Sequence, residues 1–95
     1  MPTLSHSVEI WSGKTTITNL YPTSGSYIFN VTFSNVLSTC DQGKRFSIHT
    51  TNPNYNALVS SLVAAFMAGK QINFNVNDSQ GSSCYPEINR FIVYQ

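Results

Sequence analysis

The chain has 95 residues, which is enough for one domain, residues 1–95, and too few for a second hydrophobic core. Only 9% of the residues are charged, against about 25% in an average soluble domain, and the formal net charge is +1. This balance excludes the basic surface on which nucleic-acid binding depends, and no stretch reaches the ~20 apolar residues of a membrane span, so neither nucleic acid nor membrane insertion is expected. The polar surface comes from Ser, Thr and Asn, which suits neutral ligands rich in hydroxyl groups.

The first half of the chain shows the period of two that is typical of β-strands. Val8 and Ile10 alternate in the first such segment, which places both on one face of the strand. Phe46 and Ile48 share one face of the fourth segment in the same way. The expected strands cover residues 7–12, 14–20, 26–33 and 44–50.

One helix is expected over residues 53–68, "PNYNALVSSLVAAFMA". Asn52 is the expected N-cap, Pro53 suits the first helical position, and Gly69 is the expected left-handed C-cap. Its apolar residues form two stripes, the first made of Leu58, Leu62, Ala65 and Phe66 and the second of Val59, Val63 and Met67.

A helix this apolar is not covered by a sheet on one side alone. Either the small domain surrounds it or a second copy meets it, and we expect an oligomer built on this helix. The first stripe is core in both cases, and the oligomer adds the other side of the helix.

Two further strands follow the helix. Residues 71–77 alternate strictly, which predicts an inward face of Ile72, Phe74 and Val76 and an outward face of Asn73 and Asn75. A loop at 78–87 leads to the last strand, residues 88–95. This order predicts a mainly β fold with one helix, in the α+β class. Closure into a small barrel is the simplest way to bury it, and the OB-fold, with its helix between the third and fourth strands, fits.

The two cysteines, Cys40 and Cys84, are either free thiols or one disulfide. In an oxidising compartment a bridge across their loop is worth roughly 4 kcal/mol, and we expect the disulfide and secretion. Neither cysteine belongs to a C-x-x-C pair, and only His6 and His49 are available as partners, so no metal site or cofactor is expected. The segment "MPTLSHS" is too polar for a signal peptide, so we expect Met1 to replace a removed leader.

Catalytic chemistry is not expected. The histidines lie near the N-terminus and at a strand end, and the thirteen serines make any Ser-His-Asp combination uninformative. No spacing favours a carboxylate pair among the four acids, which are Glu9, Asp41, Asp78 and Glu87. We therefore expect that the protein is not an enzyme.

Three stretches resemble the B subunits of AB5 toxins of the subtilase-cytotoxin, pertussis-like and typhoid-toxin types. The first is Trp11-Ser12-Gly13 with the β-branched residues that follow it, and the second is the strand at Tyr27-Ile28-Phe29 that leads to Cys40. The third, "YNALVSSLVAAFMAGKQINFNV", matches the family's helix, its glycine turn and an alternating strand. The resemblance covers nearly the whole chain. It implies a secreted OB-fold subunit, a homopentamer that binds cell-surface glycans and carries a catalytic A subunit, an ADP-ribosyltransferase or a protease.

The resemblance also implies a glycan-binding site. The serine that matches Ser12 hydrogen-bonds a terminal sialic acid in a shallow pocket on the side of the barrel, and the aromatic that matches Trp11 walls it. Lys14 is expected to assist a carboxylate, and Ser34 and Asn35 to approach the same pocket. Ser12→Ala is then expected to abolish sugar binding and leave the ring intact.

The chain also departs from the family pattern. Val8 stands where the family has an acid, and Val76 stands near its pocket tyrosine, so the identity of the glycan stays open. The chain has fewer cysteines than these relatives.

Each site residue has a plain structural alternative. Trp11 is also explained by packing at a barrel end, Ser12-Gly13 by a bulge or turn, and Lys14 by a solvated surface. A second function is also open: a small secreted inhibitor or immunity-type protein that blocks a partner enzyme with the loop at 78–87. A ring of five favours the toxin subunit, and a monomer favours the inhibitor.

Overall fold

The computed structural model describes residues 8–78 and 83–95. Within them the chain forms β1 (Glu9–Trp11), β2 (Thr15–Thr23), β3 (Ser26–Val31), the 3-10 helix η1 (Asp41–Gly43), β4 (Arg45–His49), α1 (Tyr55–Met67), β5 (Gln71–Asn77) and β6 (Ile88–Val93). A mainly β fold with one α-helix is therefore confirmed. Residues 1–7, which contain Met1 and His6, and residues 79–82 of the expected inhibitory loop lie outside the described residues.

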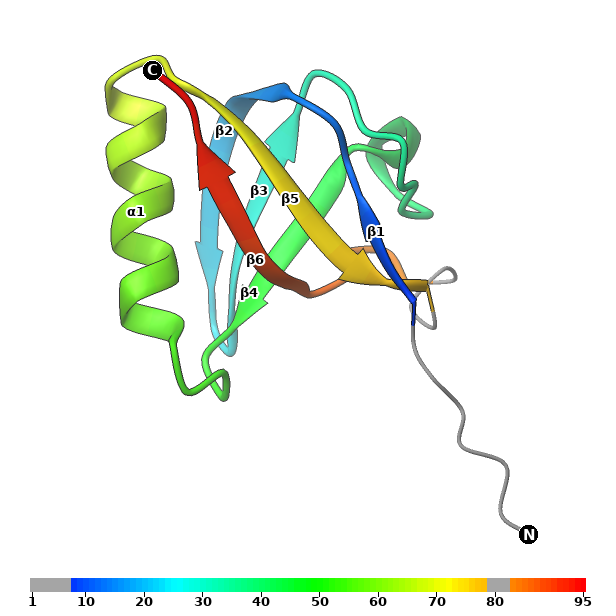
Figure 1. Ribbon diagram of the computed structural model, residues 1–95. Helices are drawn as coiled ribbons and strands as arrows, with labels where there is room; N and C mark the ends of the chain where they lie inside the picture. Colours follow the sequence, from blue (N-terminus) through cyan, green and yellow to red (C-terminus); the bar gives the residue numbers. More distant parts are fainter. Residues whose placement is uncertain (1–7, 79–82) are drawn as a thin grey trace, which may run out of the picture.

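The strands pair in the order β1-β5-β2-β3-β4, and β6 pairs with β5, all antiparallel. Figure 1 shows β5 and β6 crossing in front of β3 and β4, with α1 along one side. One isolated parallel bridge, from Ser47 to Glu87, joins β4 to the residue before β6. The sheet of the described residues is therefore not closed by a continuous ladder. The helix follows four strands because the chain bends between Trp11 and Thr15, which divides its first extended segment into β1 and β2.

The core lies between the two layers of strands. Phe29, Phe46 and Phe74, from three different strands, are fully buried, and their ring centroids lie 4.6 to 6.3 Å apart. Aromatic rings at these separations add favourable edge and stacking contacts to the free energy of burial. The other buried members of the core are Ile17, Val31, Val36, Ile48, Leu62, Ala65, Ile72, Val76 and Ile88.

Strand alternation predicts the burial of β4 and most of β5 correctly. Phe46, Ile48 and the three inward residues of β5 are at most 1% exposed. Val8 and Ile10, which alternate on one face of the first segment, stay exposed, at 57% and 38%. β1 is only three residues long and lies at the edge of the sheet, where side chains that point inward reach the rim of the core.

The helix begins at Tyr55, two residues later than predicted. Asn52 does not cap it; its Oδ1 accepts the N–H of Asn54 at 2.8 Å and forms a turn before the helix. The predicted stop at Gly69 is confirmed. Gly69 has φ of +67°, its N–H donates to Phe66 and the N–H of Lys70 donates to Ala65, which together make a Schellman C-cap.

The first apolar stripe of α1 packs on the chain's own core, as predicted. Leu62 and Ala65 are buried, and Leu58 and Phe66 pack against the core from partly buried positions. In the second stripe, Val59 and Val63 are half-buried and Met67 is 77% exposed. The side of the helix that the domain leaves open is therefore narrower than the sequence suggests.

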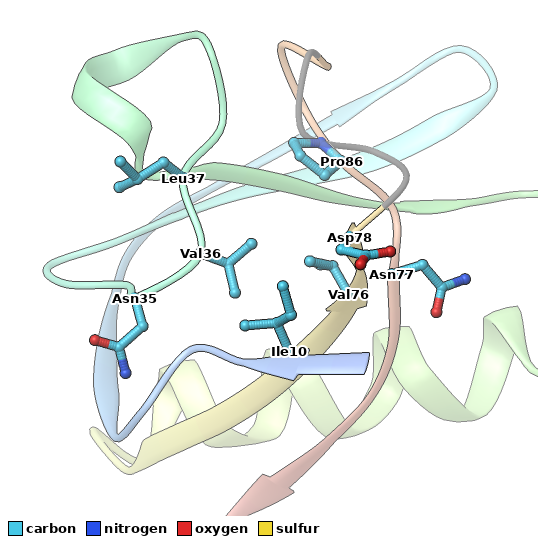
Figure 2. A pocket seen from close by; sticks show the side chains of 8 residues that line it. All are labelled: Ile10, Asn35, Val36, Leu37, Val76, Asn77, Asp78 and Pro86. Carbon is cyan, nitrogen blue, oxygen red and sulfur yellow. The ribbon is translucent and has the colours of Figure 1, made fainter. Parts of the chain in front are cut away.

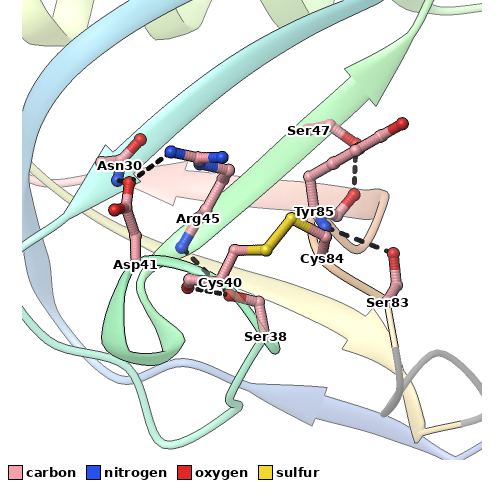
Figure 3. The surroundings of a disulfide bond; sticks show 9 residues. All are labelled: Asn30, Ser38, Cys40, Asp41, Arg45, Ser47, Ser83, Cys84 and Tyr85. Atoms are coloured by element: carbon pink, nitrogen blue, oxygen red, sulfur yellow. Dashed lines mark hydrogen bonds and ion pairs between the residues drawn. A yellow bond between two sulfur atoms is a disulfide. The ribbon is translucent and has the colours of Figure 1, made fainter.

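The predicted disulfide is confirmed. Cys40 and Cys84 are bonded, with their Cα atoms 4.8 Å apart and a separation of 44 in the sequence. Figure 3 shows the bond beside the start of β4. Next to it, the N–H of Thr39 donates to the carbonyl of Ser83 at 3.0 Å. The loop after β3 is thus tied covalently to the segment that leads into β6.

Candidate functional site

Ser12, the central residue of the predicted glycan site, is fully buried. Its Oγ donates to the carbonyl of Gly13 at 2.8 Å and accepts the N–H of Phe74 at 3.1 Å. Its own N–H donates to the carbonyl of Phe74 at 2.7 Å, which fixes the residue against β5. In this structure the hydroxyl is buried and its hydrogen bonds are made within the chain, so it holds the bend against β5.

Gly13 makes the bend that follows. Its φ is +84°, in the left-handed region that favours glycine, and its N–H donates to Oδ1 of Asn73 at 3.0 Å. A Cβ at this position would lie 3.1 Å from Cε2 of Phe33 and 3.2 Å from Nδ2 of Asn35. The N–H of Asn35 donates to the carbonyl of Ser12 at 2.9 Å. The bend thus brings the loop after β3 directly against the start of the chain.

This contact creates a cavity of about 300 Å³, which we call the pocket. Its apolar wall consists of Ile10, Val36, Leu37, Val76 and Pro86, and its polar residues are Asn35, Asn77 and Asp78. Figure 2 shows the side chains of Ile10, Val36 and Val76 gathered at its centre, with Asn35 and Asp78 on opposite sides. Such a hollow, mostly apolar with a few polar groups, is typical of small-ligand sites.

Of the predicted residues, Asn35 reaches the pocket, whereas Ser34 supports its shape. Asn35 is exposed at the rim. Ser34 is 7% exposed, and its Oγ accepts the N–H of Val36 at 3.1 Å, which holds the loop in its turn. Asp78, which sequence reasoning did not assign to a ligand site, accepts the N–H of Val8 at 3.3 Å and is the one carboxylate that lines the pocket.

The loop after β3 that carries Asn35, Val36 and Leu37, which we call the pocket loop, rests on η1. A Cβ at Gly43 would lie 2.7 Å from Cδ2 of Leu37, so the loop and η1 are in close contact. Asp41, the first residue of η1, accepts hydrogen bonds from the amide of Asn30 and from Arg45 Nη2, the latter at 2.7 Å (Figure 3). These two donors hold the pKa of Asp41 below its ordinary value of 3.8.

Trp11 and Lys14 lie on another surface. In the register of β1, β5 and β6, Trp11 pairs with Asn75, and Asn75 pairs with Arg90. The Arg90 guanidinium carbon lies 5.8 Å from the centroid of the Trp11 ring, and Lys14 Nζ lies 4.4 Å from that of Tyr94. We call the outward face of these three strands the outer patch; its residues are Glu9, Trp11, Asn73, Asn75, Arg90, Ile92 and Tyr94. Asn77, at the end of β5, borders both the outer patch and the pocket.

Asn75 was predicted to face solvent, and this prediction is wrong. Its side chain is fully buried, and within the described part of the chain neither its Nδ2 nor its Oδ1 has a hydrogen-bond partner. An amide left in this state costs about 1–3 kcal/mol of stability. No signal in the sequence marks Asn75, because it shares the same alternation with Asn73 and Asn77.

Across residues 8–78 and 83–95, no group of three His, Cys, Asp or Glu side chains is arranged to hold a metal ion. In the same part of the chain, no helix has the length and apolar character needed to cross a membrane.

Comparisons of the chain with protein-family models, with curated proteins and with solved structures found no match. Function therefore has to be inferred from the residues of the chain itself.

Proposed function

We propose that this protein is the glycan-binding B subunit of a secreted AB5-type toxin, an OB-fold chain that assembles as a homopentamer. The observation that carries the proposal is the pocket. The resemblance centres the glycan on Ser12 and Trp11, with Asn35 approaching the same pocket and Val76 near the position of the family's pocket tyrosine. Of these positions, Asn35 and Val76, which are distant in the sequence, both line this one cavity.

The strand order supports the OB-fold assignment. When β1 and β2 are counted as one bent strand, the helix falls between the third and fourth strands. This bent strand pairs with both β3 and β5, and the parallel bridge from Ser47 to Glu87 brings β4 toward β6. A small barrel of this kind leaves its side available for ligands.

The chemistry of the pocket suits a sugar. A saccharide has apolar C–H faces or an acyl group for Ile10, Val36 and Val76, and hydroxyl groups that can donate to Asn35 and Asp78. In a sialylated glycan, the sialic acid carboxylate has to point away from Asp78, because like charges repel. Lys14, the expected partner of that carboxylate, contacts Tyr94 on the outer patch instead.

The helix and the disulfide support the rest of the proposal. The second stripe of α1, which ends at the exposed Met67, offers an apolar surface to neighbouring copies around a central pore. Five equivalent sites then raise a weak affinity for cell-surface glycans through avidity. The disulfide fits a secreted protein. The ring carries a separate catalytic A subunit, an ADP-ribosyltransferase or a protease.

The test combines a glycan array with light scattering after size exclusion. Asn35→Ala is expected to lower glycan binding about tenfold, because it removes polar contacts at the rim without disturbing buried groups. Asn56→Ala, an identical change at an exposed helix position, serves as the matched control and is expected to bind like the unaltered protein.

The mass of the assembly is expected to be five times the 10.5 kDa chain. A monomer that binds no glycan would contradict the proposal and favour the alternative function, a secreted inhibitor of a partner enzyme. The loop expected to act in that inhibitor, residues 78–87, lies partly outside the described residues. Equal binding by Asn35→Ala and the unaltered protein would remove the pocket from the site.

A further inference from the structure

The central row of the outer patch places Asn75 between an aromatic ring and a cation. β5 lies between β1 and β6, so Trp11 and Arg90 flank Asn75 on its two sides. Neighbouring strands lie about 4.8 Å apart, and side chains from the two outer strands therefore have to reach across β5 to meet. The 5.8 Å between the Arg90 guanidinium carbon and the Trp11 ring shows that they do meet, above Asn75.

The side chains of the other two asparagines of β5 both take part in hydrogen bonds. Oδ1 of Asn73 accepts the N–H of Gly13 at 3.0 Å, and its Nδ2 donates to Tyr94 Oη at 3.3 Å. Oδ1 of Asn77 accepts from Nδ2 of Asn89 at 3.1 Å. Asn75 is thus the exception on this face, with a donor and an acceptor that nothing in the described chain uses. Buried polar groups in native proteins are normally paired, so an unpaired one calls for a partner.

The cover over Asn75 is movable. The side chain of Arg90 is 64% exposed, and its Nη2 is held by Oε1 of Glu9 at 3.0 Å, in a pair that is itself open to solvent. Surface pairs of this kind contribute little to stability, so the guanidinium can leave the Trp11 ring at small cost. Its departure would uncover the face of the indole and the amide of Asn75 together.

We propose that the outer patch is a second saccharide-binding site, separate from the pocket. An uncharged sugar ring replaces Arg90 on the face of Trp11, and its hydroxyl groups donate to Oδ1 and accept from Nδ2 of Asn75. Arg90 and Glu9 remain at the rim, where their opposite charges cancel and offer further hydrogen bonds to neighbouring hydroxyl groups. The Trp11 ring provides the apolar contact that a pyranose needs. The Asn75 amide and the charged groups of Arg90 and Glu9 provide the polar contacts.

Trp11 is the chain's one tryptophan, so its fluorescence reports on this patch alone. The unaltered protein is titrated with the methyl glycosides of galactose, glucose, mannose, N-acetylglucosamine and N-acetylneuraminic acid. A neutral glycoside is expected to give a saturable change in Trp11 emission and to shift the side-chain amide resonance of Asn75. If none of the neutral glycosides changes either signal, the proposal is overturned. A response confined to N-acetylneuraminic acid would also overturn it in favour of an anionic ligand.

Asn75→Leu distinguishes a binding role from a structural one. We expect it to weaken neutral-glycoside binding at least about tenfold, while the unfolding midpoint stays the same or rises, because an unpaired buried amide is removed. Asn35→Ala is the matched control, expected to leave the Trp11 response unchanged even if the pocket binds no sugar. Unaltered binding by a folded Asn75→Leu variant would contradict the proposal. If that variant does not fold, the Asn75 amide resonance of the unaltered protein decides.

Discussion

Strands β1 and β5 serve two unlike surfaces. Ile10 and Val76 line the pocket, whereas their immediate neighbours Trp11 and Asn75 belong to the outer patch. The wall of the pocket is mostly apolar, while the outer patch is mostly polar, apart from Ile92 and its aromatic rings, and contains a buried amide without a partner among the described residues. The comparison shows that alternation along a strand, and not proximity in the sequence, decides which residues share a site.

Ser12 lies between the two surfaces and belongs to neither. It is buried against β5, so it fixes the distance between Trp11 on one face and the loop of Asn35 on the other. A substitution here is expected to disturb both surfaces through stability, whereas substitutions at Asn35 and Asn75 disturb one surface each.

The largest expected effect is a loss of stability on removing the disulfide, which anchors the pocket loop and lies on the pocket side of the molecule. Replacing Cys40 and Cys84 together by alanine is expected to lower the free energy of unfolding by about 4 kcal/mol, because the unfolded chain is no longer cross-linked. Urea denaturation followed by circular dichroism measures this change. In native buffer the Trp11 emission of the folded fraction is expected to stay unchanged, since the disulfide lies away from the outer patch. A loss of less than about 1 kcal/mol would contradict this prediction.

A smaller effect is expected from Ser12→Ala. The substitution removes the acceptor that Phe74 uses and is expected to lower the free energy of unfolding by about 1–3 kcal/mol. Ser61→Ala, on the exposed side of α1, is the matched control and should be near neutral. If Ser12→Ala abolished glycan binding with no loss of stability, the sequence-based assignment of this serine to the sugar site would be restored.

The smallest expected effect is the pH dependence of η1, which supports the pocket and not the outer patch. Asp41 has a lowered pKa in the folded chain, so its carboxylate stabilises the fold above about pH 4, and this stabilisation is lost as the pH falls further. The unfolding midpoint is measured at neutral and at acidic pH. Its fall from neutral to acidic pH is expected to be smaller in Asp41→Asn than in the unaltered protein. The difference is small because the carboxylate is exposed. If the unfolding midpoints of the two proteins depended on pH in the same way, the Asp41 carboxylate would make no contribution to stability and the prediction would be wrong.

Local patterns predicted the elements well. Alternation located β4 and β5, and the glycine after the apolar run marked the end of α1. Two cysteines without metal-binding partners predicted one disulfide. The start of the helix was misplaced because Asn52 closes a turn with Asn54, which competes with capping for the same side-chain oxygen.

The structure does not bring the predicted site residues together on one surface. Asn35 lines the pocket, whereas Trp11 and Lys14 lie on another surface. Asp78 and Arg90 were missed, because isolated charged residues carry no signal in the sequence of what lies beside them in the fold. Their roles depend on partners from β1 and the loop after β3, which are distant in the chain.

The sequence by itself determined which segments are strands, where the helix ends and which cysteines pair, because these properties depend on neighbouring residues or on composition. Only the tertiary structure decided that Ser12 is buried, that Asn75 is covered without a partner, and that Asn35 meets Val76. The alternation of residues along a strand predicts the side of the strand on which each residue lies. Burial and binding depend on what packs against that side, and here the packing residues come from strands and loops that are far apart along the chain.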